Sequence, residues 1–88
     1  MTVNELIAHL QKGVKDDPTR GDKLVVCSKD SEGNYFSPLT HNFEEGFYVP
    51  DTAYYGDFYD EEDLKSDVED GFVDKNDAVA CVVFWPVN

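Results

Sequence analysis

Four aspartates recur at spacings of three, four and three residues: Asp60, Asp63, Asp67 and Asp70. At about 100° per residue, these spacings place all four carboxylates on one face of a helix, with about 5–6 Å between neighbouring Cβ atoms. Leu64 and Val68 lie roughly a quarter turn away and would anchor such a helix to the rest of the protein. A row of carboxylates resembles the charge of one nucleic-acid strand. The chemistry it predicts is ion pairing with a basic protein groove.

The candidate partner-binding set extends from this row to the acids and tyrosines beside it. It comprises Asp57, Asp60, Glu61, Glu62, Asp63, Asp67, Glu69, Asp70, Tyr54, Tyr55 and Tyr59. Exposed tyrosines beside acids are common anchors in protein–protein interfaces, whereas tyrosines of this kind also serve as cover for a core. The alternative interpretation of the whole segment is a solvated charge run that keeps a small protein soluble.

The negative charge is concentrated in one part of the chain. Residues 1–43 carry six acids and five bases, whereas residues 44–77 carry thirteen acids against two lysines, and residues 78–88 carry no charged side chain. With a net charge of −12 and only seven Lys and Arg residues, direct nucleic-acid binding and an anionic membrane surface are both disfavoured. The expected partner is therefore a basic protein, one that itself binds nucleic acid.

The sequence lacks the arrangements that enzymes and metal sites need. No nucleophile has a local histidine partner and no Gly-rich phosphate loop occurs, so we expect a protein without catalytic activity or a cofactor. Cys27, Cys81 and the two histidines lack zinc-ligand spacing, and the turns at 30–34 and 74–77 lack the ligand pattern of a calcium loop. We therefore expect no bound metal and two reduced thiols.

A helix is predicted over residues 2–16, where apolar side chains recur at helical spacing. These side chains are Val3, Leu6, Ile7, Leu10 and Val14. Thr2 and Glu5 have the spacing of a capping box, and Pro18 forces the preceding residue out of the helical region. A second, short helix is predicted at about 60–70, where carboxylates occupy the first turn.

Strands are predicted from short runs of β-branched and aromatic residues. They cover residues 22–30, 35–39 and 46–50, and a turn at 31–34 joins the first two. The last run, at 77–87, is apolar on both alternating faces, which predicts a central strand covered on two sides.

These elements predict an α+β fold in which the N-terminal helix packs on a small, mostly antiparallel sheet of three to four strands. The acidic segment 44–77 lies within a single domain of residues 1–88 and precedes the C-terminal strand. The predicted core consists of Leu6, Ile7, Leu10, Val25, Val26, Val79, Cys81 and Val83, with Trp85 near its edge. The N-terminus lacks a signal-peptide pattern and the longest apolar run is too short for a membrane span, so we expect a soluble, cytoplasmic protein.

Three motifs occur in a fixed order: TVNELIAHL at the start, SEGNYFSPL in the middle and VVFWPVN at the end. Together with the GFYVP strand they resemble a group of small tailed-phage proteins, which share a TVxELI helix, an EGNxxSPL turn-strand and a WPVN-type C-terminus. The resemblance covers most of the chain except the variable acidic middle.

This resemblance implies expression in an infected or lysogenic bacterium, and so the host cytoplasm. Because small acidic phage proteins often disable host enzymes, it also implies an inhibitor of a host defence or nucleic-acid-binding protein that acts as a nucleic-acid mimic. The alternative is a phage accessory or structural interaction module whose acidity serves only solubility.

Overall fold

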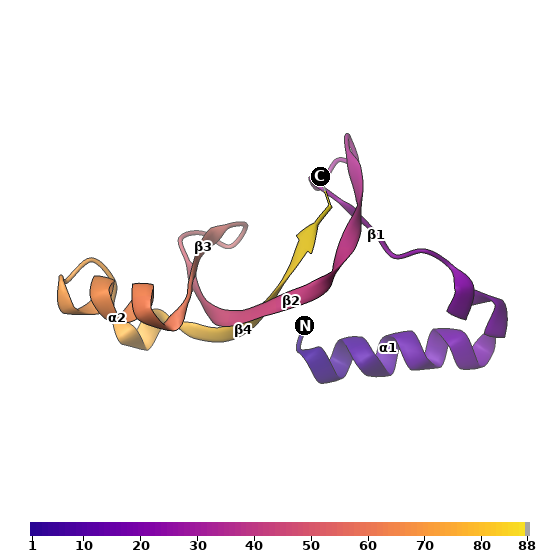
Figure 1. Ribbon diagram of the computed structural model, residues 1–88, viewed down its shortest axis with the longest axis horizontal. Helices are drawn as coiled ribbons and strands as arrows, with labels where there is room; N and C mark the ends of the chain where they lie inside the picture. The colour runs from indigo at the N-terminus through magenta and orange to yellow at the C-terminus, as the bar shows by residue number, and fades with distance from the viewer. Residues whose placement is uncertain (88) are drawn as a thin grey trace. The chain divides into compact units, whose positions relative to one another are not determined.

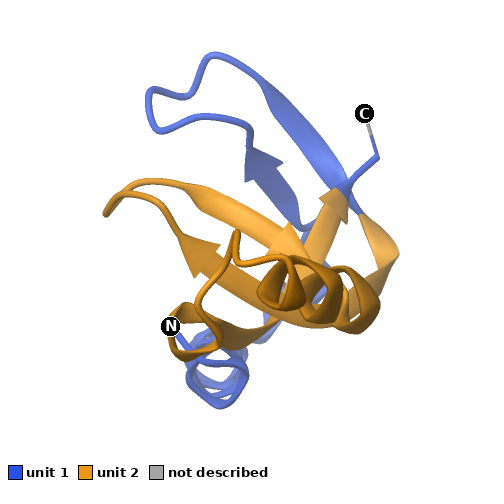
Figure 2. Cartoon of the chain, turned by 90° about the vertical axis from the view of Figure 1, so that its left-hand side faces the viewer, with its two compact units in different colours: residues 1–39, 86–88 blue, residues 40–85 orange. Residues whose placement is uncertain are grey.

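The computed structural model describes residues 1–87, which fall into two compact units, shown in two colours in Figure 2. Unit 1 comprises Met1–Leu39 together with the C-terminal residues from Pro86 onward, and unit 2 comprises Thr40–Trp85. Six acids and five bases fall in unit 1, and thirteen acids and two lysines fall in unit 2. The formal charges of the two units are therefore −1 and −11, and the acidic segment 44–77 lies wholly within unit 2. That one domain covers residues 1–88 stays a prediction.

Helix α1 (Val3–Asp16) is the longest helix of unit 1 (Figure 1). The backbone N–H of Glu5 donates to the Thr2 hydroxyl at 3.1 Å, and this hydroxyl donates to the Glu5 carboxylate at 3.1 Å. The predicted capping-box residues therefore mark the helix start. At the other end the chain turns extended at Asp17 and enters the short 3-10 helix η1 (Pro18–Asp22).

Strand β1 (Val26–Ser28) pairs antiparallel with the start of β2 (Phe36–Pro50). The turn between them is closed by a hydrogen bond from Lys29 N–H to the Tyr35 carbonyl at 2.9 Å, and Gly33 adopts φ +75°. The strand predicted at 22–30 is therefore only three residues long. Asp22 belongs to η1, residues 23–25 connect η1 to β1, and residues 29 and 30 belong to the turn.

Strand β2 is the centre of the sheet, because β1, β3 and β4 each pair with it. It is one fifteen-residue strand in place of the two predicted at 35–39 and 46–50. The expectation that the C-terminal strand β4 (Val79–Pro86) is central is corrected, because the longer β2 offers ladder positions to several short partners. Pro38 lies inside β2 and does not end the strand. Proline lacks a backbone N–H, but its carbonyl can still accept a hydrogen bond, here from Val87 N–H at 2.8 Å.

In unit 2, strand β3 (Gly56–Tyr59) pairs antiparallel with the second half of β2, with Phe47 opposite Tyr59 and Pro50 opposite Gly56. The chain then enters helix α2 (Glu61–Glu69), and the short 3-10 helix η2 (Lys75–Asp77) precedes β4 (Figure 1). The predicted short acidic helix and the α+β class are confirmed. Among residues 1–87, no helix is long and apolar enough to cross a bilayer.

The predicted core is wrong for most of its members. Among the described residues, Leu64 is the only buried apolar side chain, with 8% of its surface exposed. Five predicted core residues are exposed: Ile7, Leu10, Val25, Val26 and Val79. Leu6, Cys81 and Val83 are half-buried. Ile7 and Leu10 of α1 are exposed because the element that packs most extensively against this helix is the short η1.

Candidate functional site

Helix α2 and its two capping residues hold seven of the eleven predicted binding residues, and the helix begins at a capped N-terminus. Asp60 is the N-cap, and its carboxylate accepts from the backbone N–H of Asp63 at 2.7 Å. Glu61, Glu62 and Asp63 fill the first turn, where the positive end of the helix dipole stabilises carboxylates. One member of the predicted aspartate row is therefore occupied in capping the helix.

The C-terminal end of α2 is acidic as well. Within Glu61–Glu69 the last turn contains no base, and Asp70 is the C-cap residue. Carboxylates at this end oppose the helix dipole by about 0.3–1 kcal/mol each at exposed positions. Gly71 then ends the helix with φ +79°. The acids at this end therefore lower the stability of the helix that carries them.

Asp67 differs from the other aspartates of the row because it contacts a strand. Burial raises the pKa of Tyr59, and the charges of Asp67 and Asp57 together with a hydrogen bond to Asp67 raise it further. Asp67 is half-buried, whereas Asp63 and Asp70 are exposed. The structure thus retains the row on one helix but divides it into two exposed carboxylates, one cap and one partner of Tyr59.

The charge density of α2 can be compared directly with that of nucleic acid. Residues 60–70 hold seven acids and one lysine, a net charge of −6. At 1.5 Å per residue this stretch spans about 15 Å, or about one net charge per 2.5 Å. Duplex DNA carries about one charge per 1.7 Å and a single strand about one per 3.4 Å. The helix therefore falls between the two.

The predicted tyrosines of the segment are not all beside α2. Tyr54 and Tyr55 lie in the loop between β2 and β3, where the Thr52 hydroxyl accepts from the N–H of Tyr54 at 3.1 Å. Tyr54 is 94% exposed. The four residues of β3 separate this loop from Asp60, so Tyr55 and Asp60 are about 17 Å apart along the extended chain. Tyr54 and Tyr55 are thus a second cluster, within one standard interface footprint of α2.

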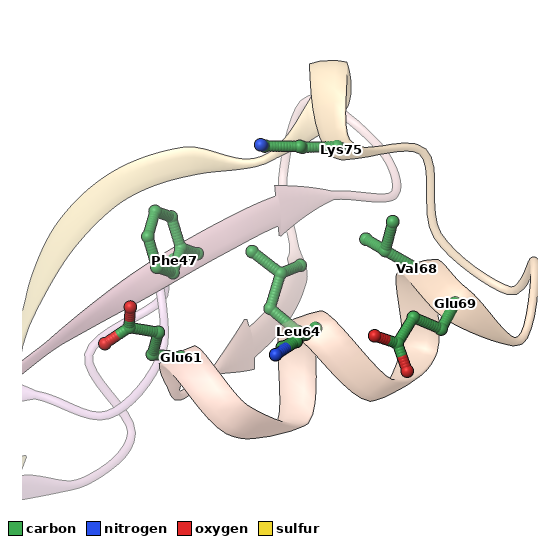
Figure 3. Close-up of a pocket in the computed structure, with 7 residues that line it drawn as sticks. Phe47, Glu61, Leu64, Val68, Glu69 and Lys75 are labelled. Atoms are coloured by element: carbon green, nitrogen blue, oxygen red, sulfur yellow. The ribbon is translucent and has the colours of Figure 1, made fainter.

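A hollow of about 510 Å³ lies beside α2 (Figure 3). Phe47, Leu64 and Val68 supply its apolar surface, and four charged residues also line it: Glu61, Lys65, Glu69 and Lys75. Sequence reasoning assigned no site role to Phe47 or Lys75. The signal that points to Lys75 is that it and Lys65 are the only bases of unit 2, and both line this hollow.

Outside unit 2, the carboxylate of Asp30 forms hydrogen bonds only within its own turn. The Asp30 carboxylate accepts from the N–H groups of Glu32 and Asn34 at 2.9 and 3.2 Å, and these hydrogen bonds, the one from Asn34 above all, lower its pKa. This carboxylate therefore organises the turn before β2. Within residues 1–87 no three His, Cys, Asp or Glu side chains are grouped as metal ligands, and Cys27 and Cys81 are free.

Comparison of the chain with protein-family models, with curated proteins and with solved structures gives no match. The resemblance to tailed-phage proteins and the expected absence of catalysis stay predictions. The geometry defines an acidic surface on one unit, with an aromatic loop at the other end of β3.

Proposed function

We propose that this chain is a phage-encoded binding protein that inhibits a basic host protein, one that binds nucleic acid or serves in host defence. Its acidic unit would occupy the partner's groove in place of nucleic acid, and the chain would act in the host cytoplasm without catalysing a reaction. The observation that carries the proposal is the charge of −6 over residues 60–70, which are α2 and its two capping residues, at a density between those of one and two nucleic-acid strands.

Exposed carboxylates suit this role because a groove built for phosphates presents Lys and Arg side chains. Glu62, Asp63 and Asp70 are exposed, and their carboxylates accept none of the hydrogen bonds described above. A surface of one sign steers a partner of the other sign into contact and weakens as salt screens it. Asp60 and Asp67 hold the helix and its contact with Tyr59, so they maintain the shape that displays the others.

Two features support this function over solubility alone. Solubility requires net charge anywhere on the surface, whereas eleven of the twelve net negative charges lie in unit 2. Glu69 and Asp70 also sit at the end of α2 where carboxylates are unfavourable. An arrangement that costs helix stability is expected where the charges are used for binding.

The test compares two triple variants of equal charge. Glu62→Gln/Asp63→Asn/Asp70→Asn neutralises exposed acids of α2, and Glu44→Gln/Glu45→Gln/Asp51→Asn neutralises three exposed acids elsewhere in unit 2. Each changes the net charge from −12 to −9. The immobilised parent and variants are incubated with bacterial lysate at low salt, and the retained proteins are identified by mass spectrometry.

We expect a basic, nucleic-acid-binding protein to be retained by the parent and by the control variant, to be lost from the α2 variant, and to be released by added duplex DNA. If both variants retain the captured protein equally, the proposal is wrong. The acidity of α2 would then serve only solubility, in an accessory or structural module.

A further inference from the structure

The loop between β2 and β3 carries two adjacent tyrosines that pack little against unit 2. The loop comprises residues 51–55, and the pairing of Pro50 with Gly56 closes it. Of the aromatic side chains that the structure describes, Tyr54 is the most exposed, at 94% of its surface. Tyr55 beside it is 61% exposed. The Tyr54 ring therefore adds almost no packing to the unit that carries it.

Hydrogen bonds within the loop fix its backbone. The Tyr55 carbonyl accepts from the N–H groups of Asp51 and Thr52, both at 3.0 Å. The Thr52 hydroxyl accepts from the N–H groups of Tyr54 and Tyr55 at 3.1 and 3.3 Å. All four hydrogen bonds join residues of the loop to each other, so the backbone beneath the Tyr54 ring is held in one conformation. A side chain on a preorganised loop loses less conformational entropy on binding than one on a mobile loop.

The same loop is continuous with the acidic surface. Asp51 and Asp57 flank the tyrosines, and β3 leads from the loop to Asp60 at the start of α2 (Figure 1). Residues 51–70 hold nine acids and a single base, Lys65. All of these residues belong to unit 2, so the order from aromatic ring to carboxylates is set within one unit.

An aromatic ring beside a row of negative charge corresponds to one form of nucleic acid. In a duplex the bases are paired and stacked on each other, so a protein reaches phosphates and base edges in the grooves. In a single strand the faces of the bases are accessible, and proteins stack aromatic side chains on them. The ring of Tyr54 offers such a face, and α2 supplies the charge that phosphates carry.

We propose that Tyr54 takes the place of an unstacked base, so that the partner of the acidic unit is a protein that binds single-stranded nucleic acid. This inference rests on the function proposed above and narrows the class of host protein. The partner would provide an aromatic side chain or an Arg guanidinium, on which the Tyr54 ring stacks, next to the basic groove for α2. Along the chain, β3 and α2 span at most about 32 Å, or about nine nucleotides at about 3.4 Å each. Single-strand-binding domains cover about 4–16 nucleotides.

Nitration of the full chain with tetranitromethane, followed by mass spectrometry of its peptides, tests whether the Tyr54 ring is accessible. We expect Tyr54 to be nitrated at least tenfold faster than Tyr48, which is half-buried in β2. The captured host protein, added in excess, should slow nitration of Tyr54 at least tenfold. If Tyr54 reacts no faster than Tyr48 in the free chain, or if the captured protein does not protect it, the proposal is wrong.

Variants then test whether the ring itself is bound. Tyr54→Leu retains an apolar side chain and the backbone N–H that the loop uses, but removes the aromatic face. It should weaken binding of the captured protein by about 5- to 160-fold, the range expected for the loss of one stacked ring. Tyr54→Phe keeps that face and should bind nearly as the parent does. The matched control is Tyr35→Leu, because Tyr35 is 70% exposed in unit 1, and it should leave binding unchanged.

Competition by defined nucleic acids identifies the class of partner. The competitors are an oligothymidylate of about 16 nucleotides, an abasic strand of the same length, and a duplex with the same number of phosphates. We expect the oligothymidylate to release the captured protein at a concentration at least tenfold lower than either of the others. Equal competition by all three, or parent-like binding of Tyr54→Leu, would overturn this inference and leave the proposed function standing. Equal binding of the two charge-matched triple variants would overturn both.

Discussion

Leu64→Ala tests the buried apolar side chain of α2. The substitution removes three carbon atoms from a side chain that is 8% exposed, which corresponds to about 2.4 kcal/mol at about 0.8 kcal/mol per buried methylene. Such substitutions cost about 2–5 kcal/mol, and the upper part of that range reflects an empty cavity. Leu64 adjoins an open hollow that also contacts Val68 and Phe47, so water can fill the space. We therefore expect a loss of about 2–3 kcal/mol in the free energy of unfolding, at the lower end of the range.

Urea denaturation followed by circular dichroism measures this loss, and thermal unfolding should show a Tm lower by about 10–20 °C, at about 4–8 °C per kcal/mol for a domain of this size. The matched control is Leu24→Ala, because Leu24 is 75% exposed. Its effect should stay within about 0.5 kcal/mol. Equal effects of the two substitutions, or a loss below about 1 kcal/mol in Leu64→Ala, would refute the view that Leu64 holds α2 in place.

Three further predictions follow from the same geometry. Gly71→Ala should lower the free energy of unfolding by about 1–2 kcal/mol, because φ is +79° there, and thermal unfolding measures it. Because the folded-state pKa of Tyr59 is raised above 10.0, the stability that its neutral form provides is retained below pH 10 and lost as the pH rises through the folded-state value. Tyr59→Phe should abolish that alkaline loss, and a titration followed by tyrosinate absorbance should lose one group that titrates above pH 10. Sodium chloride should raise the Tm of the parent, because it screens repulsion within a unit of charge −11; a Tm that falls with salt would contradict this.

Helix ends were predictable from the sequence because their signals are local. Thr2 and Glu5 are three residues apart and interact with each other, so the start of α1 follows from the sequence alone. Pro18 likewise locates its end. For α2, the carboxylates of the first turn and Gly71 after the last turn were sufficient signals.

Strand partners and burial depend on residues far apart in the chain, and the sequence pattern was a poor guide to them. Residues 40–45, all polar except Phe43, fell between the two strands predicted at 35–39 and 46–50, yet they continue β2. The apolar periodicity at Ile7 and Leu10 predicts a face that becomes buried, but it does not say against which surface. In the structure, Ile7 and Leu10 are 46% and 57% exposed.

In the candidate site too, local features were predictable from the sequence and long-range contacts were not. The spacing of the four aspartates predicted one helix; the structure has Asp63 and Asp67 within α2 and Asp60 and Asp70 as its two capping residues. Their individual roles required coordinates, because the cap at Asp60 depends on backbone direction and the contact of Asp67 depends on where β3 places Tyr59. The hollow beside Phe47 brings together three separate segments, which no local pattern indicates.

The central claim is that carboxylates of α2 replace phosphates, and the most direct test is the affinity of the captured partner for the two charge-matched variants across a salt series. Removing three exposed ion pairs of about 0.2–1 kcal/mol each should weaken binding by about 3- to 140-fold in Glu62→Gln/Asp63→Asn/Asp70→Asn, with a shallower salt dependence. The control Glu44→Gln/Glu45→Gln/Asp51→Asn should bind nearly as the parent does, and duplex DNA should compete with both. Equal affinities for the two variants, or binding that duplex DNA does not displace, would contradict nucleic-acid mimicry by α2.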